Sequence, residues 1–171
     1  GYGGGIACTN NVTGTIFDCW IEGNTAEGNY NEGAGIYMSQ SAPYVHNVVI
    51  ADNQASGPYS EGGGVATSFT PSPTFEQCTL VGNGCSPQGT AGGTYTTFNA
   101  TTEFINCIVA ASPQGAAAVC AFGGAPTFTG CDLWNNAGGD AICGTDGGCN
   151  FSLDPLFCTE PDYLSHVQRG S

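Results

Sequence analysis

Basic residues are almost absent from this chain. Arg169 is the single arginine, there is no lysine, and 14 acidic residues bring the formal net charge to −13. Such a chain would repel nucleic acids and anionic membrane surfaces, because both are polyanions. Cations, neutral glycans and basic proteins remain as partners, and we expect no nucleic-acid binding.

Long apolar runs and helical periodicity are also missing. No stretch approaches the roughly 20 apolar residues of a membrane-spanning helix, so we expect no membrane insertion. No stretch repeats its apolar residues with a helical period either. Charged residues make up only 9% of the chain, whereas glycine is the commonest residue at 28. The sequence therefore predicts an all-β protein with a surface of amide, hydroxyl and small side chains.

The chain holds ten cysteines, and their spacing does not suggest a zinc site. No paired CxxC units are present, and the two histidines, His46 and His166, are far apart. Disulfides persist in oxidising compartments, so we expect a secreted, extracellular or cell-surface protein. No signal peptide is visible and the chain opens inside a repeat, which predicts a mature or excised fragment.

A six-residue phrase recurs five times along the chain. It reads apolar, any residue, polar residue or glycine, cysteine or valine, any residue, apolar, and its copies start at Ile16, Val45, Phe75, Phe104 and Phe128. A stretch of small residues, such as Gly33–Gly35, precedes each copy, and an asparagine follows most copies. A nearly fixed period in this range indicates stacked repeats.

Each unit carries three short strand signals separated by turn residues. This pattern resembles the right-handed parallel β-helix of the pectate-lyase-like kind, from Gly3 to about Leu133. The tail string Asp154–Cys158 followed by Asp162–Leu164 resembles the ends of bacterial secreted repeat proteins of this type. The resemblance implies an all-β, single-stranded β-helix of about five coils over residues 1–140. It also implies an irregular, disulfide-pinned extension over residues 141–171, with a truncated end.

Stacked coils place equivalent residues above one another at roughly 4.8 Å. The inward first-strand stack is expected to be Ile6, Ile36, Val65, Thr94 and Val119. A second inward stack is the cysteine column of Cys19, Cys78, Cys107 and Cys131. Polar residues at the bends should form hydrogen-bonded corner ladders: Asp18, Asn47, Gln77 and Asn106 at one corner, then Asn24, Asn53, Asn83 and Asn136 at the next. Asparagine tolerates the left-handed backbone that such corners need.

The column cysteines are expected to be buried thiols. A cross-coil disulfide such as Cys78–Cys107, or a metal–thiolate column, is the alternative. The remaining cysteines are candidates for disulfides in loops and the tail: Cys8, Cys85, Cys120, Cys143, Cys149 and Cys158. We take Cys143–Cys149 as the first pairing, with Cys120–Cys143 as its rival.

Two groups of carboxylates are candidate Ca²⁺ sites, because hard cations prefer oxygen ligands. Glu32 and Glu61 occupy the same position of adjacent units, a spacing that would also suit the carboxylate pair of a retaining glycosidase. Asp140, Asp146 and Asp154 form the second group. The plainer alternative for both groups is solvated carboxylates, with no cofactor.

Four tyrosines recur at matching positions. Tyr37 and Tyr95 share an outward position of the first strand, and Tyr30 matches Tyr59 in successive loops. Exposed tyrosines could stack on sugar rings or on a protein partner. The alternative is that these tyrosines are present because tyrosine favours β-strands, with no binding role.

The resemblance also raises polysaccharide lyases and hydrolases. Lyases of this fold use a lysine or arginine base, and the hydrolases carry Gly-His-Gly and Arg-Ile-Lys strings that do not occur here. We therefore expect a non-catalytic solenoid with a structural or adhesive role. It would bind a glycan or a surface protein, or self-associate into filaments through open β-helix ends. A polysaccharide-active enzyme using Glu32 and Glu61 is the alternative.

Overall fold

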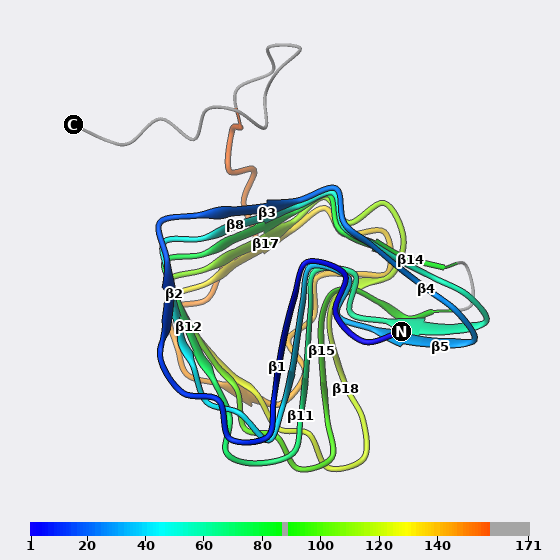
Figure 1. The fold of residues 1–171 in the computed structure, drawn as a ribbon. Coiled ribbons are helices and arrows are strands. Elements are labelled where there is room, and N and C mark those ends of the chain that lie inside the picture. The colour runs from blue at the N-terminus through cyan, green and yellow to red at the C-terminus, as the bar shows by residue number, and fades with distance from the viewer. Residues whose placement is uncertain (87–88, 158–171) are drawn as a thin grey trace.

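A computed structural model describes residues 1–86 and 89–157, whose strands wind into a β-solenoid (Figure 1). All strand pairs are parallel, and each joins equivalent residues of neighbouring coils. None of the described residues is helical. No helix in this part of the chain could therefore cross a membrane. The predicted all-β parallel solenoid is confirmed.

Three sheets form the main body. Sheet 1 contains β1 (Ile6–Thr9), β6 (Ile36–Ser39), β11 (Val65–Ser68), β15 (Ala91–Thr97) and β18 (Ala116–Cys120). Sheet 2 contains β2 (Thr15–Phe17), β7 (Tyr44–His46), β12 (Thr74–Glu76), β16 (Glu103–Ile105), β19 (Thr127–Thr129) and β21 (Thr145–Asp146). Sheet 3 contains β3 (Trp20–Glu22), β8 (Val49–Ala51), β13 (Thr79–Val81), β17 (Ile108–Ala110) and β20 (Asp132–Trp134). Five strands stack in sheets 1 and 3, one from each of the five expected coils, and the chain completes about four turns from the first to the fifth.

Two smaller sheets form a side lobe next to the outer face of sheet 1 (Figure 1). Sheet 4 contains β4 (Thr25–Glu27), β9 (Gln54–Ser56) and β14 (Gly84–Cys85). Sheet 5 contains β5 (Tyr30–Glu32) and β10 (Tyr59–Glu61). The prediction of three strands per coil is therefore wrong for the first two coils, which have five, and for the third, which has four. Their long variable segments also pair in register instead of remaining loops.

The inward residues form one continuous core. Phe75, Phe104 and Phe128 are fully buried, and successive rings stack with centroids 5.1 and 4.7 Å apart. The column thiols of Cys78, Cys107 and Cys131 are buried and not disulfide-bonded, whereas Cys19 in the first coil is half-buried. Each of the three buried thiols donates a hydrogen bond to a carbonyl two residues earlier, as Cys107 Sγ does to Ile105 O at 3.4 Å.

One inward position differs from the expected stack. The register between β15 and β18 shifts between Ala91 and Thr94, so Thr94 pairs with Ala118 and Tyr95 pairs with Val119. Val119 therefore lies on the outer face of sheet 1, and its predicted inward position is wrong. The last repeat is shorter than the others, and this irregularity absorbs the missing length.

The polar position of the phrase turns the chain from sheet 2 into sheet 3. All five residues there have positive φ, between 50 and 64°: Asp18, Asn47, Gln77, Asn106 and Gly130. Asn47 Nδ2 donates to Asp18 Oδ1 at 2.6 Å, which links two coils along this corner. The repeated phrase therefore specifies a bend whose central residue has the left-handed backbone conformation, as well as the strands on either side of it.

The second asparagine series forms a buried ladder at the end of sheet 3. Asn53 Nδ2 donates to Asn83 Oδ1 at 2.9 Å, and Asn24 Nδ2 donates to Asn53 Oδ1 at 2.9 Å. Asn136 Oδ1 accepts from the backbone N–H of Ser112 at 3.1 Å. The expected reason for asparagine here is wrong, because positive φ occurs one residue earlier: Gly23, Asp52, Gly82, Ala111 and Asn135. The amides are instead needed as internal hydrogen-bonding groups.

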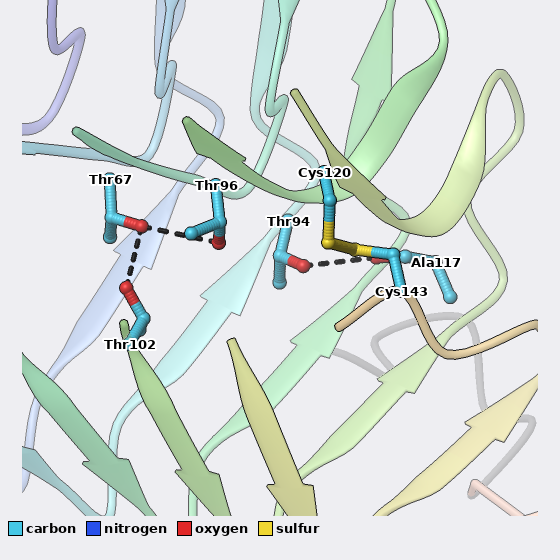
Figure 2. Close-up of a disulfide and its surroundings, with 7 residues drawn as sticks. All are labelled: Thr67, Thr94, Thr96, Thr102, Ala117, Cys120 and Cys143. Atoms are coloured by element: carbon cyan, nitrogen blue, oxygen red, sulfur yellow. Dashed lines mark hydrogen bonds between the residues drawn. A yellow bond between two sulfur atoms is a disulfide. The ribbon is translucent and has the colours of Figure 1, made fainter. Parts of the chain in front are cut away.

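The described C-terminal segment stacks on the last coil and is fixed by a disulfide. Figure 2 shows Cys120 of β18 bonded to Cys143, with Cα atoms 5.7 Å apart. The first-choice pairing Cys143–Cys149 is therefore wrong, and the rival is confirmed; Cys149 is exposed and free. β21 then adds to sheet 2, and Phe151 bridges to Asp132 of β20.

Two further disulfide candidates are free buried thiols. Cys8 occupies an inward position of β1, and Cys85 pairs with Ala55 in sheet 4. Both act as small core residues, so their assignment to disulfides is wrong. Cys158 lies outside the described residues.

Candidate functional site

Glu32 and Glu61 pair directly across sheet 5. The Glu61 carboxylate accepts hydrogen bonds from the backbone N–H groups of Thr90 and Ala91, both at 2.8 Å. Burial raises the pKa of the Glu32 carboxyl, and the neighbouring Glu61 raises it further. The two carboxylates are therefore neighbours as expected, but Glu61 caps the backbone where sheet 5 ends.

Tyr30 and Tyr59 form an exposed pair on the same sheet. Their rings stack with centroids 4.8 Å apart, and each residue is more than 60% exposed. Because the two rings cover each other, only their edges and outer faces are open to a ligand. This pair lies on the surface, as a binding role would require.

Tyr37 and Tyr95 are not exposed. They are 9% and 8% exposed and pack with Ala66 and Ala91 in a second apolar cluster on the outer face of sheet 1. Burial raises the pKa of Tyr95, and Glu32 and Glu61 raise it further. The expectation that these tyrosines form an open stacking surface is wrong, because the side lobe lies next to that face.

The aspartates of the second candidate cation group serve local backbone turns. Asp140 accepts from the N–H groups of Asn135 and Asn136 at 3.0 and 2.9 Å. Asp146 accepts from Gly148 N and Asp154 from Leu156 N, both at 2.9 Å. Within residues 1–86 and 89–157, no three His, Cys, Asp or Glu side chains come together as a metal site would require.

Sequence reasoning missed Asp132, a buried residue near this group. Burial raises the pKa of its carboxyl, a hydrogen bond from Leu153 N–H lowers it, and Asp140 and Asp154 raise it again. Asp132 is the last variable position of the phrase, and only the fold shows that the tail turns back over it. Its carboxylate accepts from Leu153 N at 3.0 Å and so helps to hold the tail on the last coil.

Sequence reasoning also missed an exposed rank of phenylalanines at the end of sheet 1. Phe69, Phe98 and Phe122 stack with centroids 4.9 and 5.0 Å apart and remain 43%, 39% and 70% exposed. All three have positive φ, from 46 to 62°. Asn10 and Gln40 occupy the same corner in the first two coils, also with positive φ. We call Phe69, Phe98 and Phe122 the phenylalanine rank.

The interior near this corner contains hydroxyls in place of apolar side chains. Thr67 Oγ1 lies 3.3 Å from Thr96 Oγ1 and 2.7 Å from Thr102 Oγ1 (Figure 2). Thr94 Oγ1 donates to Ala117 O at 3.4 Å, close to the disulfide (Figure 2). These buried hydroxyls bond to one another or, for Thr94, to a backbone carbonyl, so they link the coils and are not open to a ligand.

A family model described as the right-handed beta helix region matches residues 18–154 of the chain. The match begins in the first copy of the phrase and ends beyond β21, so it spans most of the coils. Neither the curated proteins nor the solved structures contain a match to this sequence.

Proposed function

This chain belongs to the right-handed β-helix family, and we propose that it is a non-catalytic, extracellular β-solenoid with an adhesive role. Its ligands on this proposal are neutral glycans of a surface or matrix. The net charge of −13 disfavours acidic polysaccharides and nucleic acids by repulsion. The Cys120–Cys143 disulfide supports an oxidising compartment.

The phenylalanine rank is the observation that carries this proposal. A bulky side chain in the left-handed region costs about 1–2 kcal/mol, whereas asparagine occupies it easily. The first two coils make the same bend with Asn10 and Gln40, so the fold does not require an aromatic residue there. Phenylalanine at three successive copies of this corner therefore favours a contact function of the exposed rings.

The carboxylates of the chain support a non-catalytic role. Glu61, Asp140, Asp146 and Asp154 each accept backbone N–H groups, so these acids stabilise bends and strand ends. Exposed aromatic rings and neutral polar groups are available to a partner alongside exposed acids such as Glu22, Glu27 and Glu103. Aromatic rings bind the apolar faces of sugars without requiring charge on either side.

Retention of the chain on immobilised neutral and acidic polysaccharides tests the proposal. The triple variant Phe69→Asn, Phe98→Asn and Phe122→Asn should keep the fold, because asparagine suits this corner, and should lose retention on the neutral ligand. Leu153→Asn is the control, since it removes an exposed apolar side chain elsewhere. Unchanged retention of the triple variant would refute the adhesive role of the rank.

A polysaccharide-active enzyme is the second candidate, supported by the Glu32–Glu61 pair. A carboxyl with a raised pKa beside a second carboxyl is the arrangement of a general acid and its partner. Release of reducing ends from a polysaccharide, abolished by Glu32→Gln and retained in Glu27→Gln, would establish this function. Glu27 is a suitable control because it is an exposed glutamate of the same lobe.

Self-association of coils is a further part of the adhesive proposal. β1, β2 and β3 each pair on one side only, and the inward Ile6, Ile16 and Cys19 beside them are only half-buried. Open parallel edges invite another copy to add its strands, which would give head-to-tail filaments. Sedimentation of the purified chain over a concentration series measures this directly, and a monomer throughout would exclude it.

A further inference from the structure

A small hollow lies on the outer surface of the corner between sheets 2 and 3. Its volume is about 170 Å³. Its lining is Asp18, Trp20, Asn47, Gln77 and Thr79, with Val48 and Val49 between them. It is separate from the side lobe and from the phenylalanine rank, and the carboxylate pair does not contribute to it.

The local fold fixes the backbone that carries the polar side chains of this hollow. Asp18, Asn47 and Gln77 occupy one corner position in successive coils, with φ of 50, 52 and 53°. Paired strands on both sides of each bend restrict the backbone further. A ligand would therefore meet a column of polar groups that is already ordered, which lowers the entropic cost of binding.

Trp20 supplies the aromatic side of the hollow. It lies on β3 beside Val49, in the outward row that continues to Thr79, and it is 45% exposed. An indole combines a broad apolar face with one N–H donor. Partly exposed tryptophan next to ordered polar groups is a common composition of small-ligand sites.

The hydrogen bonds within the hollow leave both donors and acceptors available. Asn47 Nδ2 donates to Asp18 Oδ1 at 2.6 Å, and Gln77 Oε1 lies 2.8 Å from His46 Nε2. Among the described residues, the other Asp18 oxygen, Asn47 Oδ1 and the Gln77 amide N–H groups have no further protein partner at this corner. A ligand that both donates and accepts through several hydroxyls would satisfy all three.

We infer that this hollow is a subsite for one neutral sugar ring of a glycan, stacked on Trp20 and hydrogen-bonded by Asp18, Asn47 and Gln77. Sugar hydroxyls match the mixed donors and acceptors, and the apolar C–H face of the ring matches the indole. The hollow has no cationic side chain, and Asp18 would repel a uronate or phosphate. The inference rests on the proposed glycan adhesion and assigns it a recognition site.

Trp20 provides a direct measurement, because Trp134 is the single other tryptophan. In a Trp134→Phe background, titration with neutral gluco-, manno- and N-acetylglucosamine oligosaccharides should give a saturable change in Trp20 emission. Trigalacturonate, as the charged counterpart, should give none. An equal response to trigalacturonate would overturn the assignment to a neutral sugar.

Glycine variants of the corner test the polar contacts with little effect on the fold, because Gly130 occupies the same position in the last coil with φ 64°. Asn47→Gly and Gln77→Gly should each weaken binding about tenfold, the scale of one well-made hydrogen bond. Asn106→Gly is the matched control, since it changes the same corner outside the hollow. Trp20→Ala should remove binding while leaving the circular dichroism unchanged.

The outcomes separate this inference from the proposed function. If Trp20→Ala and Asn47→Gly bind a neutral glycan as the wild type does, and the phenylalanine-rank variant does not, the subsite is refuted and the adhesive function stands. If the wild type binds none of the neutral oligosaccharides or polysaccharides, both are refuted. Loss of binding in the hollow variants alone would locate recognition at this corner.

Discussion

Replacement of Asn53 by alanine tests whether the buried asparagine ladder holds the coils together. Asn53 is fully buried, and its side chain takes part in four hydrogen bonds. Nδ2 donates to Ile21 O at 2.8 Å and to Asn83 Oδ1 at 2.9 Å. Oδ1 accepts from the backbone N–H and the side-chain amide of Asn24, both at 2.9 Å.

The expected cost follows from the groups that lose their partners. Alanine would remove the hydrogen-bond partner of Ile21 O and of the Asn24 N–H. A buried polar group that loses its partner costs about 1–3 kcal/mol. Asn83 Oδ1 keeps the backbone N–H of residue 53 at 3.0 Å, so it contributes less. We therefore expect Asn53→Ala to lower the free energy of unfolding by about 2–5 kcal/mol.

Asn24→Ala is the matched control at the open end of the ladder. Its side chain is half-buried and donates one hydrogen bond, to Asn53 Oδ1, so the expected loss is about 1 kcal/mol. Urea unfolding followed by circular dichroism gives both values. If the two variants lie within about 0.5 kcal/mol of each other, the ladder does not stabilise the fold as argued.

Three further changes have defined outcomes. Cys143→Ser opens a link of 23 residues and should cost about 3 kcal/mol, with loss of hydrogen-exchange protection first at β21; protection that persists there would contradict the pinning role. Because burial raises the pKa of Glu32 above its ordinary value of 4.5, the folded state loses stability as pH rises through the raised pKa. Glu32→Gln should therefore flatten the stability–pH curve above pH 4.5 in urea melts, and an unchanged curve would argue against the burial. Gly35→Ala would place a Cβ 2.5 Å from Gly64 O and should cost about 1–3 kcal/mol by thermal melting; a wild-type melting temperature would rule out this close packing.

The recurring phrase was sufficient to predict sheets 2 and 3 and the bend between them. The bend needs a residue that accepts positive φ, and the chain places Asp, Asn, Gln, Asn and Gly there in turn. These preferences for positive φ belong to the individual residue types, so they can be recognised in the sequence without knowledge of the fold. The inward cysteine column follows from the same alternation of side chains along the strands.

The side lobe could not be predicted in the same way, because the segments that form it share few residues. Tyr30–Glu32 and Tyr59–Glu61 are alike, but they end after two copies, and a strand of three residues has little pattern of its own. The error on Tyr37 and Tyr95 follows from this. Alternation predicts correctly that both point outward, whereas exposure depends on what lies outside the sheet.

The disulfide and the register of the last coil depend on distances that sequence spacing does not determine. Cys143 lies six positions from Cys149 and 23 from Cys120, and the nearer cysteine in sequence is not the bonded one. Val119 moved to the outer face because the last repeat is short and β15 carries an irregularity at its start. The disulfide depends on how the tail folds back over the final turn, and the register depends on the length of the last repeat.

The two surface features that carry the functional proposals differ in how visible they are in the sequence. At the corner of the hollow, Asp18, Asn47 and Gln77 adopt the positive φ that the bend requires and also offer polar groups to a ligand. The need for a bend accounts for these residues in the sequence, so the phrase alone does not indicate a binding role. The phenylalanine rank has no such explanation, because asparagine or glutamine makes the same bend two coils earlier. A residue that local preference opposes, and that stays exposed in three successive coils, is the stronger indication of a selected contact surface. The rank is therefore the stronger evidence for adhesion.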